Sequence, residues 1–203
     1  MLHGIRDPPR LLYMKQTIST ILEQGANLRA SLVKNETFLE GVAQAADGLL
    51  ATIRQGGTIY ACGNGGSSCD AMHLVEELVA RYKRERPGIR AQHFVDPSVL
   101  TCWSNDYSFD AVFERQAETF CGPHDSLIAI STSGNSRNVV AAAKVAKRKG
   151  SSVIGLLGRD GGELASLCAP AIIVPSKETE RIQEIHITVI HILCELIETA
   201  PAV

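Results

Sequence analysis

The chain reads Ser-Leu-Ile-Ala-Ile-Ser-Thr-Ser-Gly-Asn-Ser from Ser126 to Ser136, an apolar run that ends in a turn rich in hydroxyl side chains. Such a run predicts a buried strand, and residues 138–149 after it have the apolar spacing of a helix. Hydroxyls, free backbone N–H groups and the positive end of a helix dipole would then meet at one point. This arrangement favours the binding of an anion such as phosphate.

Four other short apolar runs resemble this one, and segments of helical length lie between most of the five. We expect strands at 58–62, 91–95, 126–130, 152–157 and 171–174, and helices at 70–83, 110–120, 138–149 and 181–199. Strands that alternate with helices indicate βαβ units. The sequence therefore predicts an α/β fold with a five-stranded parallel sheet covered by helices on both faces.

The region before the first strand predicts two helices, because residues 14–55 carry helical periodicity that breaks near Asn35. Residues 1–13 contain two prolines and no clear pattern, so we expect a disordered extension there, and Met14 is an alternative start. No linker or repeat divides the remainder. We expect a single domain over residues 14–203 that includes the N-terminal helices.

Composition excludes several classes of function. The 203 residues are 45% hydrophobic and 21% charged with a formal net charge of −2, which gives no basic face for nucleic acid. No apolar run approaches the ~20 residues of a membrane span, and no signal region is recognisable. The six cysteines include no Cys-x-x-Cys pair. We expect a cytoplasmic protein with reduced thiols and no membrane contact.

Polar turns follow three of the predicted strands, at the sheet edge where open α/β folds bind ligands. They lie at 63–68, 131–136 and 158–162. The first turn lacks a dinucleotide fingerprint because Ser68 stands where the third glycine belongs. Glycines there also suit a plain strand-to-helix turn, but two such turns at one edge favour a ligand site.

The helix predicted after the first turn places Asp70, His73, Glu77 and Arg81 on one face. His73 and Glu77 could share a metal ion or a substrate, although a solvated pair has the same spacing. Without further context, the spacing leaves both readings open.

The last predicted helix carries Gln183, His186 and His191 in an otherwise apolar stretch. One of the histidines could be a core residue with a satisfied hydrogen bond. Gln183 and His191 lie about 12 Å apart along an ideal helix, so that both reach one ion only by leaning toward each other. Metal binding by this helix stays open on spacing alone.

Taken together, the ordered motifs closely resemble the sugar isomerase (SIS) family and, within it, the sedoheptulose 7-phosphate isomerases, also called phosphoheptose isomerases. The resemblance runs from about Ile18 to Glu198. The motifs are CGNGGS at 62–67, DAMH at 70–73, EEL at 76–78, STSGNS at 131–136, GG at 161–162 and RIQEIH at 181–186 through His191.

The resemblance implies a three-layer flavodoxin-like sandwich, a homotetramer with the N-terminal helices in a central bundle, and sites built at subunit interfaces. It implies conversion of sedoheptulose 7-phosphate to D-glycero-D-manno-heptose 7-phosphate in heptose biosynthesis, usually with zinc, one ion per subunit. Carried over by position, the phosphate-binding residues are Ser131, Thr132, Ser133 and Ser136, and the sugar-binding residues are Asn64, Gly65, Gly66, Asn105, Asp106 and Gln183. The acid/base pair is Glu77 and His191, and the zinc ligands are His73, Glu77, Gln183 and His191.

These residue types suit the reaction. Moving a carbonyl between C2 and C1 needs a base for a carbon-bound proton, an acid for the oxygens, and a group that stabilises the enediolate. A carboxylate, an imidazole and a Lewis-acidic ion supply all three. A Glu or His bound tightly to zinc carries protons poorly, so either the metal moves during turnover or one role is secondary. The N/O ligand set also suits several divalent ions.

Three departures from the family pattern bear on the identity of the sugar: Glu180 before the RIQ run, Ser68 in the first turn, and the aromatic pair Trp103 and Tyr107 in the substrate loop. Two alternatives remain. One is a non-catalytic phosphosugar-binding regulator or adaptor, whose members typically lose the residues at positions 77 and 191; both persist here. The other is an isomerase of a five- or six-carbon phosphosugar.

Overall fold

The computed structural model describes residues 8–200 and divides the chain into two compact units, Met1–Asn35 and Glu36–Val203. The first unit holds helix α1, Pro8–Leu32. The predicted disordered extension is wrong from Pro8 onward, because proline suits the first turn of a helix and the turn simply continues into the pattern that begins at Met14. Residues 1–7 of that prediction lie outside the described residues.

Helix α1 exposes most of its large apolar side chains. The exposed fractions run from 44% to 68% for Leu11, Leu12, Tyr13, Met14, Ile18, Ile21 and Leu22. Exposed apolar surface on this scale is typical of a segment that meets another protein surface.

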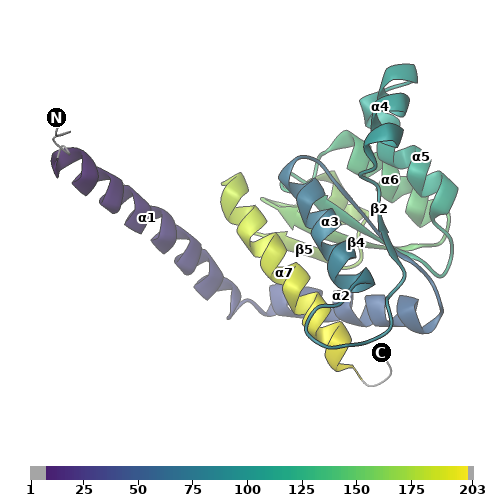
Figure 1. Ribbon diagram of the computed structural model, residues 1–203, viewed down its shortest axis with the longest axis horizontal. Helices are drawn as coiled ribbons and strands as arrows, with labels where there is room; N and C mark the ends of the chain where they lie inside the picture. Colours follow the sequence, from purple (N-terminus) through teal and green to yellow (C-terminus); the bar gives the residue numbers. More distant parts are fainter. Residues whose placement is uncertain (1–7, 201–203) are drawn as a thin grey trace, which may run out of the picture. The chain divides into compact units, whose positions relative to one another are not determined.

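The second unit alternates strands and helices, as predicted (Figure 1). Its strands are β1 Ile59–Gly63, β2 Ala91–His93, β3 Ser126–Ser131, β4 Ser152–Gly158 and β5 Ala171–Val174. Its α-helices are α2 Glu36–Arg54, α3 Gly66–Val79, α4 Pro97–Asp106, α5 Val112–Phe120, α6 Arg137–Arg148 and α7 Thr179–Thr199, with 3-10 turns η1 Phe109–Ala111 and η2 Glu163–Ser166. Among residues 8–200, no helix is long and apolar enough to cross a membrane.

The five strands form one parallel sheet in the order β2-β1-β3-β4-β5, which confirms the predicted sheet. Gly63 at the end of β1 pairs with Ile130 of β3, and Ser131 pairs with Leu157 of β4. The carboxyl ends of these three strands therefore lie at one level of the sheet, and so do the turns that follow them.

Helices cover both faces of the sheet (Figure 1). Helices α5 and α6 pack on one face over a cluster that includes Phe94, Phe113 and Leu127, all at most 1% exposed. Helices α2, α3 and α7 pack together on the other face. The strands β1 and β3 are buried along their whole length, as a parallel sheet between two helical layers requires.

The sequence does not predict helix α4, because none of its residues is fully buried and its contact with the core is limited to the partly buried Leu100 and Trp103. Its local signals are at its start. The Asp96 carboxylate accepts a hydrogen bond from the Val99 N–H at 3.0 Å, and Pro97 occupies the first turn. Helix α3 also differs from the prediction, because it begins at Gly66 inside the glycine turn and ends at Val79.

All six cysteines are free thiols, as predicted. Cys62, Cys121, Cys168 and Cys194 are buried, whereas Cys69 and Cys102 are exposed. Burial raises the pKa of Cys121 to about 11 and the pKa values of Cys168 and Cys194 to about 12. The buried thiols therefore stay protonated and act as small packing groups.

His186 on α7 is the core histidine that the sequence analysis left open. Its side chain is fully buried, and Nε2–H donates a hydrogen bond to the Leu157 carbonyl of β4 at 3.1 Å. In the described part of the chain, Nδ1 has no hydrogen-bond partner. Burial lowers the pKa of His186 to about 4, so the ring is neutral in the folded protein.

Replacing His186 with Leu should flatten the pH dependence of stability. Between pH 6.5 and 4 the unfolded chain binds a proton at this residue and the folded chain does not, so acid destabilises the wild type. We expect the wild type to lose on the order of 2 kcal/mol relative to His186→Leu between pH 7 and pH 4.5. Urea unfolding of both proteins at both pH values measures this change in the free energy of unfolding. If the difference between the two proteins did not depend on pH, His186 would not be the neutral buried histidine described above.

Candidate functional site

The turn between β1 and α3 is built from glycines that leave no room for side chains. Gly65 has φ +55°, a region that favours glycine. A Cβ on Gly63 would lie 2.6 Å from the Ser67 carbonyl oxygen, and one on Gly66 would lie 2.3 Å from Nε2 of Gln183. The Gln183 amide of α7 therefore rests directly on the first residue of α3.

Asn64 in this turn is paired with Asn138 at the start of α6. Each amide donates to the other's oxygen, at 2.8 and 2.9 Å, and Asn138 is 2% exposed. The pair joins the glycine turn to the hydroxyl turn of β3 and fixes the orientation of both amides. Asn138 carries no motif of its own, and its only signal in the sequence is its place two residues after Ser136.

The hydroxyl turn after β3 is held by its own side chains. Ser131 Oγ lies 2.9 Å from Ser136 Oγ and 3.5 Å from Ser133 Oγ, and it accepts the Gly134 N–H at 3.1 Å. Ser136 precedes α6 but makes no side-chain cap. In that first turn the Val139 N–H donates to Asn138 Oδ1 at 2.9 Å, and the N–H groups of Arg137 and Asn138 stand beside the hydroxyl turn, as at anion-binding helix starts.

The third polar turn, after β4, packs against the hydroxyl turn. Gly134 has φ +67°, and a Cβ there would lie 2.0 Å from the Gly161 carbonyl oxygen. The Glu163 N–H donates to Asn135 Oδ1 at 2.9 Å. The structure thus brings the polar turns to one place, as predicted, and both backbone contacts and the Asn135 side chain join the second turn to the third.

A cavity of about 620 Å³ opens beside the hydroxyl turn. It is lined by Ser133, Asn135, Arg159, Asp160, Pro175, Ser176 and Lys177. Two cationic side chains and a serine hydroxyl suit an anionic ligand, and the one carboxylate of the lining, Asp160, accepts the Gly162 N–H at 3.1 Å. The turn that contains Arg159 is one of the predicted polar turns, but Arg159 and Lys177 themselves are not predicted from the sequence, because isolated basic residues carry no motif.

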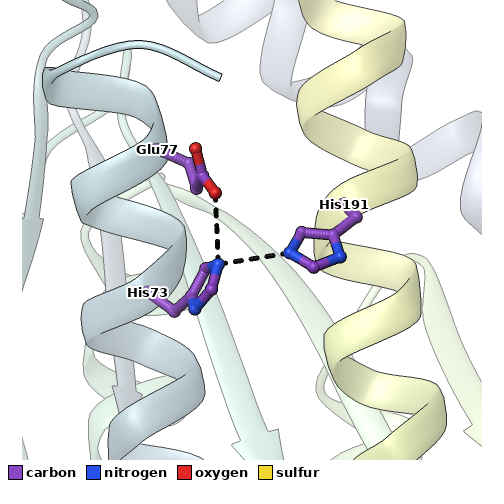
Figure 2. Close-up of side chains that lie close together, drawn as sticks. All are labelled: His73, Glu77 and His191. Atoms are coloured by element: carbon purple, nitrogen blue, oxygen red, sulfur yellow. Dashed lines mark hydrogen bonds and ion pairs between the residues drawn. The ribbon is translucent and has the colours of Figure 1, made fainter. Parts of the chain in front are cut away.

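A second cluster joins α3 to α7 (Figure 2). His73 Nε2 lies 3.2 Å from Glu77 Oε1 and 3.2 Å from Nε2 of His191, and all three side chains are partly buried. The two histidine rings meet edge to face, with centroids 5.1 Å apart. Only one of the two facing Nε2 atoms can carry a proton in this contact, so one lone pair is always directed at its neighbour.

The donor atoms of this cluster fit a divalent metal ion. They all lie within 4.8 Å of one another. A tetrahedral ion about 2.0–2.1 Å from each ligand would separate the ligand atoms by about 3.3 Å, close to the two contacts of His73. Two imidazoles and a carboxylate with one open position are a ligand set of catalytic zinc sites, although several divalent ions accept it.

Gln183, the fourth residue predicted to bind the metal, lies on α7 eight residues before His191. Its amide lies on Gly66, which is two helical turns before His73 on α3. In the described part of the chain, no hydrogen bond joins Gln183 to the triad. The contact of Gln183 with Gly66 places its amide at the glycine turn, where its contact with a sugar is predicted; its role as a metal ligand stays a prediction.

Asn105 and Asp106 lie exposed at the end of α4, where the Asn105 amide donates to Asp106 Oδ1 at 2.9 Å. Within residues 8–200, neither is hydrogen-bonded to the turns or to the triad. The neighbouring Trp103 and Tyr107 stack on each other with ring centroids 4.1 Å apart, and Arg115 lies over the Trp103 ring. Glu180 is exposed in the first turn of α7.

Asp70 and Arg81, predicted on the same face of α3, have different surroundings. Asp70 is 9% exposed, and its Oδ2 has no hydrogen-bond partner among the described residues. Burial raises the pKa of Asp70 to about 6, although the nearby His73 opposes this. Arg81 lies beyond the end of α3 and approaches Glu85 at 4.0 Å on the surface. Only His73 and Glu77 of the four form the cluster.

Comparison with known proteins agrees with this geometry. The profile of the SIS domain matches residues 22–158. Phosphoheptose isomerases of Helicobacter hepaticus and Cytophaga hutchinsonii are 47% and 46% identical over 184 and 186 residues, covering 90% and 91% of this chain and 94% and 97% of theirs.

Two solved structures are similar over almost the same length. The phosphoheptose isomerase of Neisseria gonorrhoeae is 36% identical with a TM-score of 0.86, over 92% of this chain and 100% of that one. That of Francisella tularensis is 29% identical with a TM-score of 0.88, over 92% of this chain and 99% of that one. Each similarity therefore extends over nearly the whole chain.

Removing one imidazole of the triad should weaken metal binding. We expect His73→Ala to bind Zn²⁺ at least ~100-fold more weakly than the wild type, because loss of a direct ligand costs more than loss of a supporting contact. Competition with a chromophoric chelator measures the affinity. His124→Ala, which removes a surface histidine that contacts Gln55, is the control. Equal affinities for His73→Ala and the wild type would exclude the triad as the zinc site.

Proposed function

The chain belongs to the SIS-domain phosphoheptose isomerase family, and from that premise we propose that it converts sedoheptulose 7-phosphate to D-glycero-D-manno-heptose 7-phosphate with a bound zinc ion. The family reaction is the isomerisation of sedoheptulose 7-phosphate. The observation that carries the proposal for this chain is the cluster of His73, Glu77 and His191, which unites proton carriers and metal donors from two helices.

The phosphate would bind at the hydroxyl turn. Ser131, Thr132, Ser133 and Ser136 offer hydroxyl groups there, and the start of α6, which Ser136 does not cap, offers the N–H groups of Arg137 and Asn138. Arg159 and Lys177 of the adjoining cavity would add positive charge. An anion held at C7 orients the rest of the sugar, and Asn64, Gly65, Gly66 and Gln183 at the glycine turn would contact its hydroxyls.

Proton transfer would fall to Glu77 and His191. The reaction removes a proton from C1 of the ketose, returns one to C2, and moves a proton between the two oxygens. One member of the pair takes the carbon-bound proton while the other serves the oxygens. Both groups are partly buried, which limits exchange of the transferred proton with water.

A zinc ion at the triad would supply Lewis-acid stabilisation of negative charge on the substrate oxygens. His73, Glu77 and His191 would hold it, with Gln183 as the fourth ligand that the family resemblance implies. The lone pairs with which Glu77 and His191 would bind zinc are those that they need for proton transfer, so the two roles compete. His73 and Gln183 have no assigned proton role and are the ligands free of that conflict.

We also propose that the chain works as a homotetramer in the cytoplasm, with α1 in the subunit contacts. The exposed apolar side chains of α1, such as Leu12, Ile18 and Leu22, support assembly. Asn105 and Asp106 stand apart from the triad in the single chain, which is compatible with a site completed by a neighbouring subunit.

The decisive test is an isomerisation assay with sedoheptulose 7-phosphate, before and after chelation and with zinc restored, followed by NMR of the aldoheptose phosphate. We expect turnover that chelation abolishes and zinc restores. A protein that binds the sugar without converting it would favour the phosphosugar-binding regulator. Faster turnover of a five- or six-carbon phosphosugar would favour the other isomerase and would point to the Trp103–Tyr107 stack.

Substitutions in the acid/base pair should abolish most turnover without unfolding the protein. Glu77→Gln and His191→Ala should each lower kcat at least ~10²-fold, the usual loss when a general acid or base is removed. Circular dichroism serves as the check on folding. A kcat near that of the wild type would remove the residue from the pair.

Substitutions in the hydroxyl turn should act on binding instead. Ser133→Ala combined with Ser136→Ala removes two of the hydroxyls offered to the phosphate, and we expect KM to rise ~10-fold or more with a smaller change in kcat. Steady-state kinetics separates the two constants. An unchanged KM would reject the hydroxyl turn as the phosphate site.

A further inference from the structure

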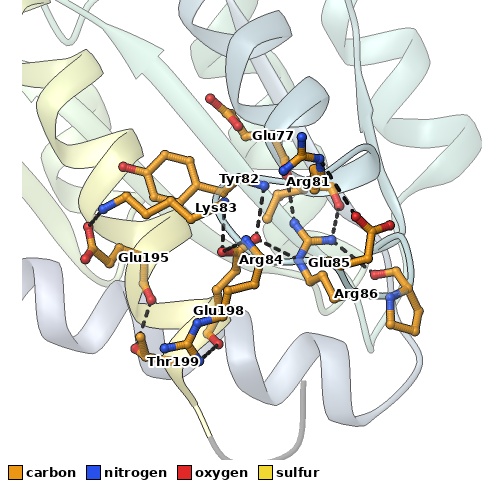
Figure 3. Close-up of polar contacts among 12 residues, drawn as sticks. Glu77, Arg81, Tyr82, Lys83, Arg84, Glu85, Arg86, Glu195, Glu198 and Thr199 are labelled. Carbon is orange, nitrogen blue, oxygen red and sulfur yellow. Dashed lines mark hydrogen bonds and ion pairs between the residues drawn. The ribbon is translucent and has the colours of Figure 1, made fainter.

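Glu198, near the end of α7, carries a buried carboxylate that binds residues 82–86, the segment after α3 (Figure 3). Its side chain is 3% exposed. The backbone N–H of Tyr82 donates to Oε1 at 2.9 Å, and those of Lys83 and Arg84 donate to Oε2 at 3.0 Å. Burial alone would raise the pKa of Glu198, but these N–H groups and Arg86 outweigh it and hold the pKa below its usual range.

Arg86 extends the network to α3. Its Nε donates to Glu198 Oε1 at 3.2 Å, and its side chain is 6% exposed. Nη2 donates to the carbonyl of Glu77 at 2.7 Å, and Nη1 donates to the carbonyl of Leu78 at 2.8 Å. The last carbonyls of a helix have no partner inside the helix, so Arg86 caps α3.

This network touches the triad at two points. The carbonyl held by Arg86 belongs to Glu77 itself. The ring of Tyr82, whose N–H is bound to Glu198, stacks on the ring of His191 with centroids 5.8 Å apart and 27° between the planes. Glu198 lies two turns after His191 on the same face of α7. One carboxylate therefore constrains the surroundings of both residues of the proposed acid/base pair.

Stability alone does not require such a network. A buried ion pair loses the solvation of both charges, and apolar side chains of similar size often join two helices at least as well. Hydrogen bonds add direction, because each fixes a distance and an angle that apolar contacts leave free. Four donors on a single carboxylate fix the path of residues 82–86 relative to α7.

We propose that Glu198 is a positioning residue: by holding residues 82–86 it keeps the Tyr82 ring on His191 and the last turn of α3 against α7, and so sets the relation of Glu77 to His191. The expected effect on turnover rests on the proposed function. The effect on His191 rests on the geometry alone.

The chain offers a matched control on the same helix. Glu195 also contacts this segment, since its Oε2 accepts a hydrogen bond from Lys83 Nζ at 2.7 Å. The side chains of this pair are 58% and 53% exposed, and a surface pair contributes little. Glu195→Gln removes one charge from α7, as Glu198→Gln does, and leaves the buried network intact.

The first measurement is the NMR signal of the His191 ring in the metal-free protein, together with Zn²⁺ affinity by chelator competition. In Glu198→Gln we expect the His191 signals to move as the ring current of Tyr82 is lost, and Zn²⁺ affinity to fall ~10- to 100-fold. Glu195→Gln should stay within about twofold of the wild-type affinity. A folded Glu198→Gln with wild-type His191 signals and affinity would overturn the proposal.

Kinetics separates positioning from a general loss of structure. We expect Glu198→Gln to lower kcat ~10-fold or more while KM changes less than about threefold, because the phosphate turn lies elsewhere. A loss confined to KM would overturn the proposal. An inactive wild type would refute the proposed function, whereas the His191 signals would still test the positioning.

A second pair of variants covers the case in which Glu198→Gln fails to fold. Tyr82→Leu keeps the backbone N–H and the whole Glu198–Arg86 network but removes the ring from His191, and we expect Zn²⁺ affinity to fall ~10-fold. Tyr82→Phe restores the ring and should restore most of that affinity. Equal affinities for Tyr82→Leu and the wild type would overturn the proposal.

Discussion

The parallel register of β1, β3 and β4 is the constraint on which the site depends. Because Gly63 pairs with Ile130, and Ser131 with Leu157, three strands end at one level and their turns begin side by side. Glycines occupy close-packed positions at that level. A Cβ at Gly134 would lie 2.0 Å from the Gly161 oxygen, and one at Gly158 would lie 2.4 Å from the Thr132 oxygen. Hydroxyls and amides are thus presented by a dense backbone layer that has little freedom to move.

Two helices that leave this layer carry the second half of the site. Helix α3 begins in the glycine turn and α7 rests its Gln183 amide on that beginning, so the two helices are already aligned at one end. The Glu198–Arg86 network joins them at the other end. His73, Glu77 and His191 lie between these two joints. Both ends of the helix pair are therefore fixed by polar contacts, and the triad occupies the span between them.

The sequence predicted what depends on local patterns and missed what depends on distant partners. Alternating strands and helices, and polar turns at strand ends, follow from apolar spacing and turn residues, and so they were found. Helix α4 was not, because its only signals are its Asp96 cap and Pro97. Spacing could pair His73 with Glu77, but His191 joins them only through tertiary structure and was assigned through family resemblance. Glu198 had no signal at all, because three of its partners are backbone N–H groups more than 100 residues away.

The distribution of sulfur has a practical consequence. Thiolates, not thiols, react with peroxides and maleimides, and burial keeps Cys121, Cys168 and Cys194 protonated far above neutral pH. Electrophiles therefore reach two exposed thiols before the buried ones: Cys69 on the helix that carries His73, and Cys102 on α4. Of the two, Cys102 is the less reactive, because its hydrogen bond to the Asp106 carboxylate raises its pKa. The wild-type chain thus already offers two attachment points for probes, one on α3 and one on α4, while the thiols of its core do not react.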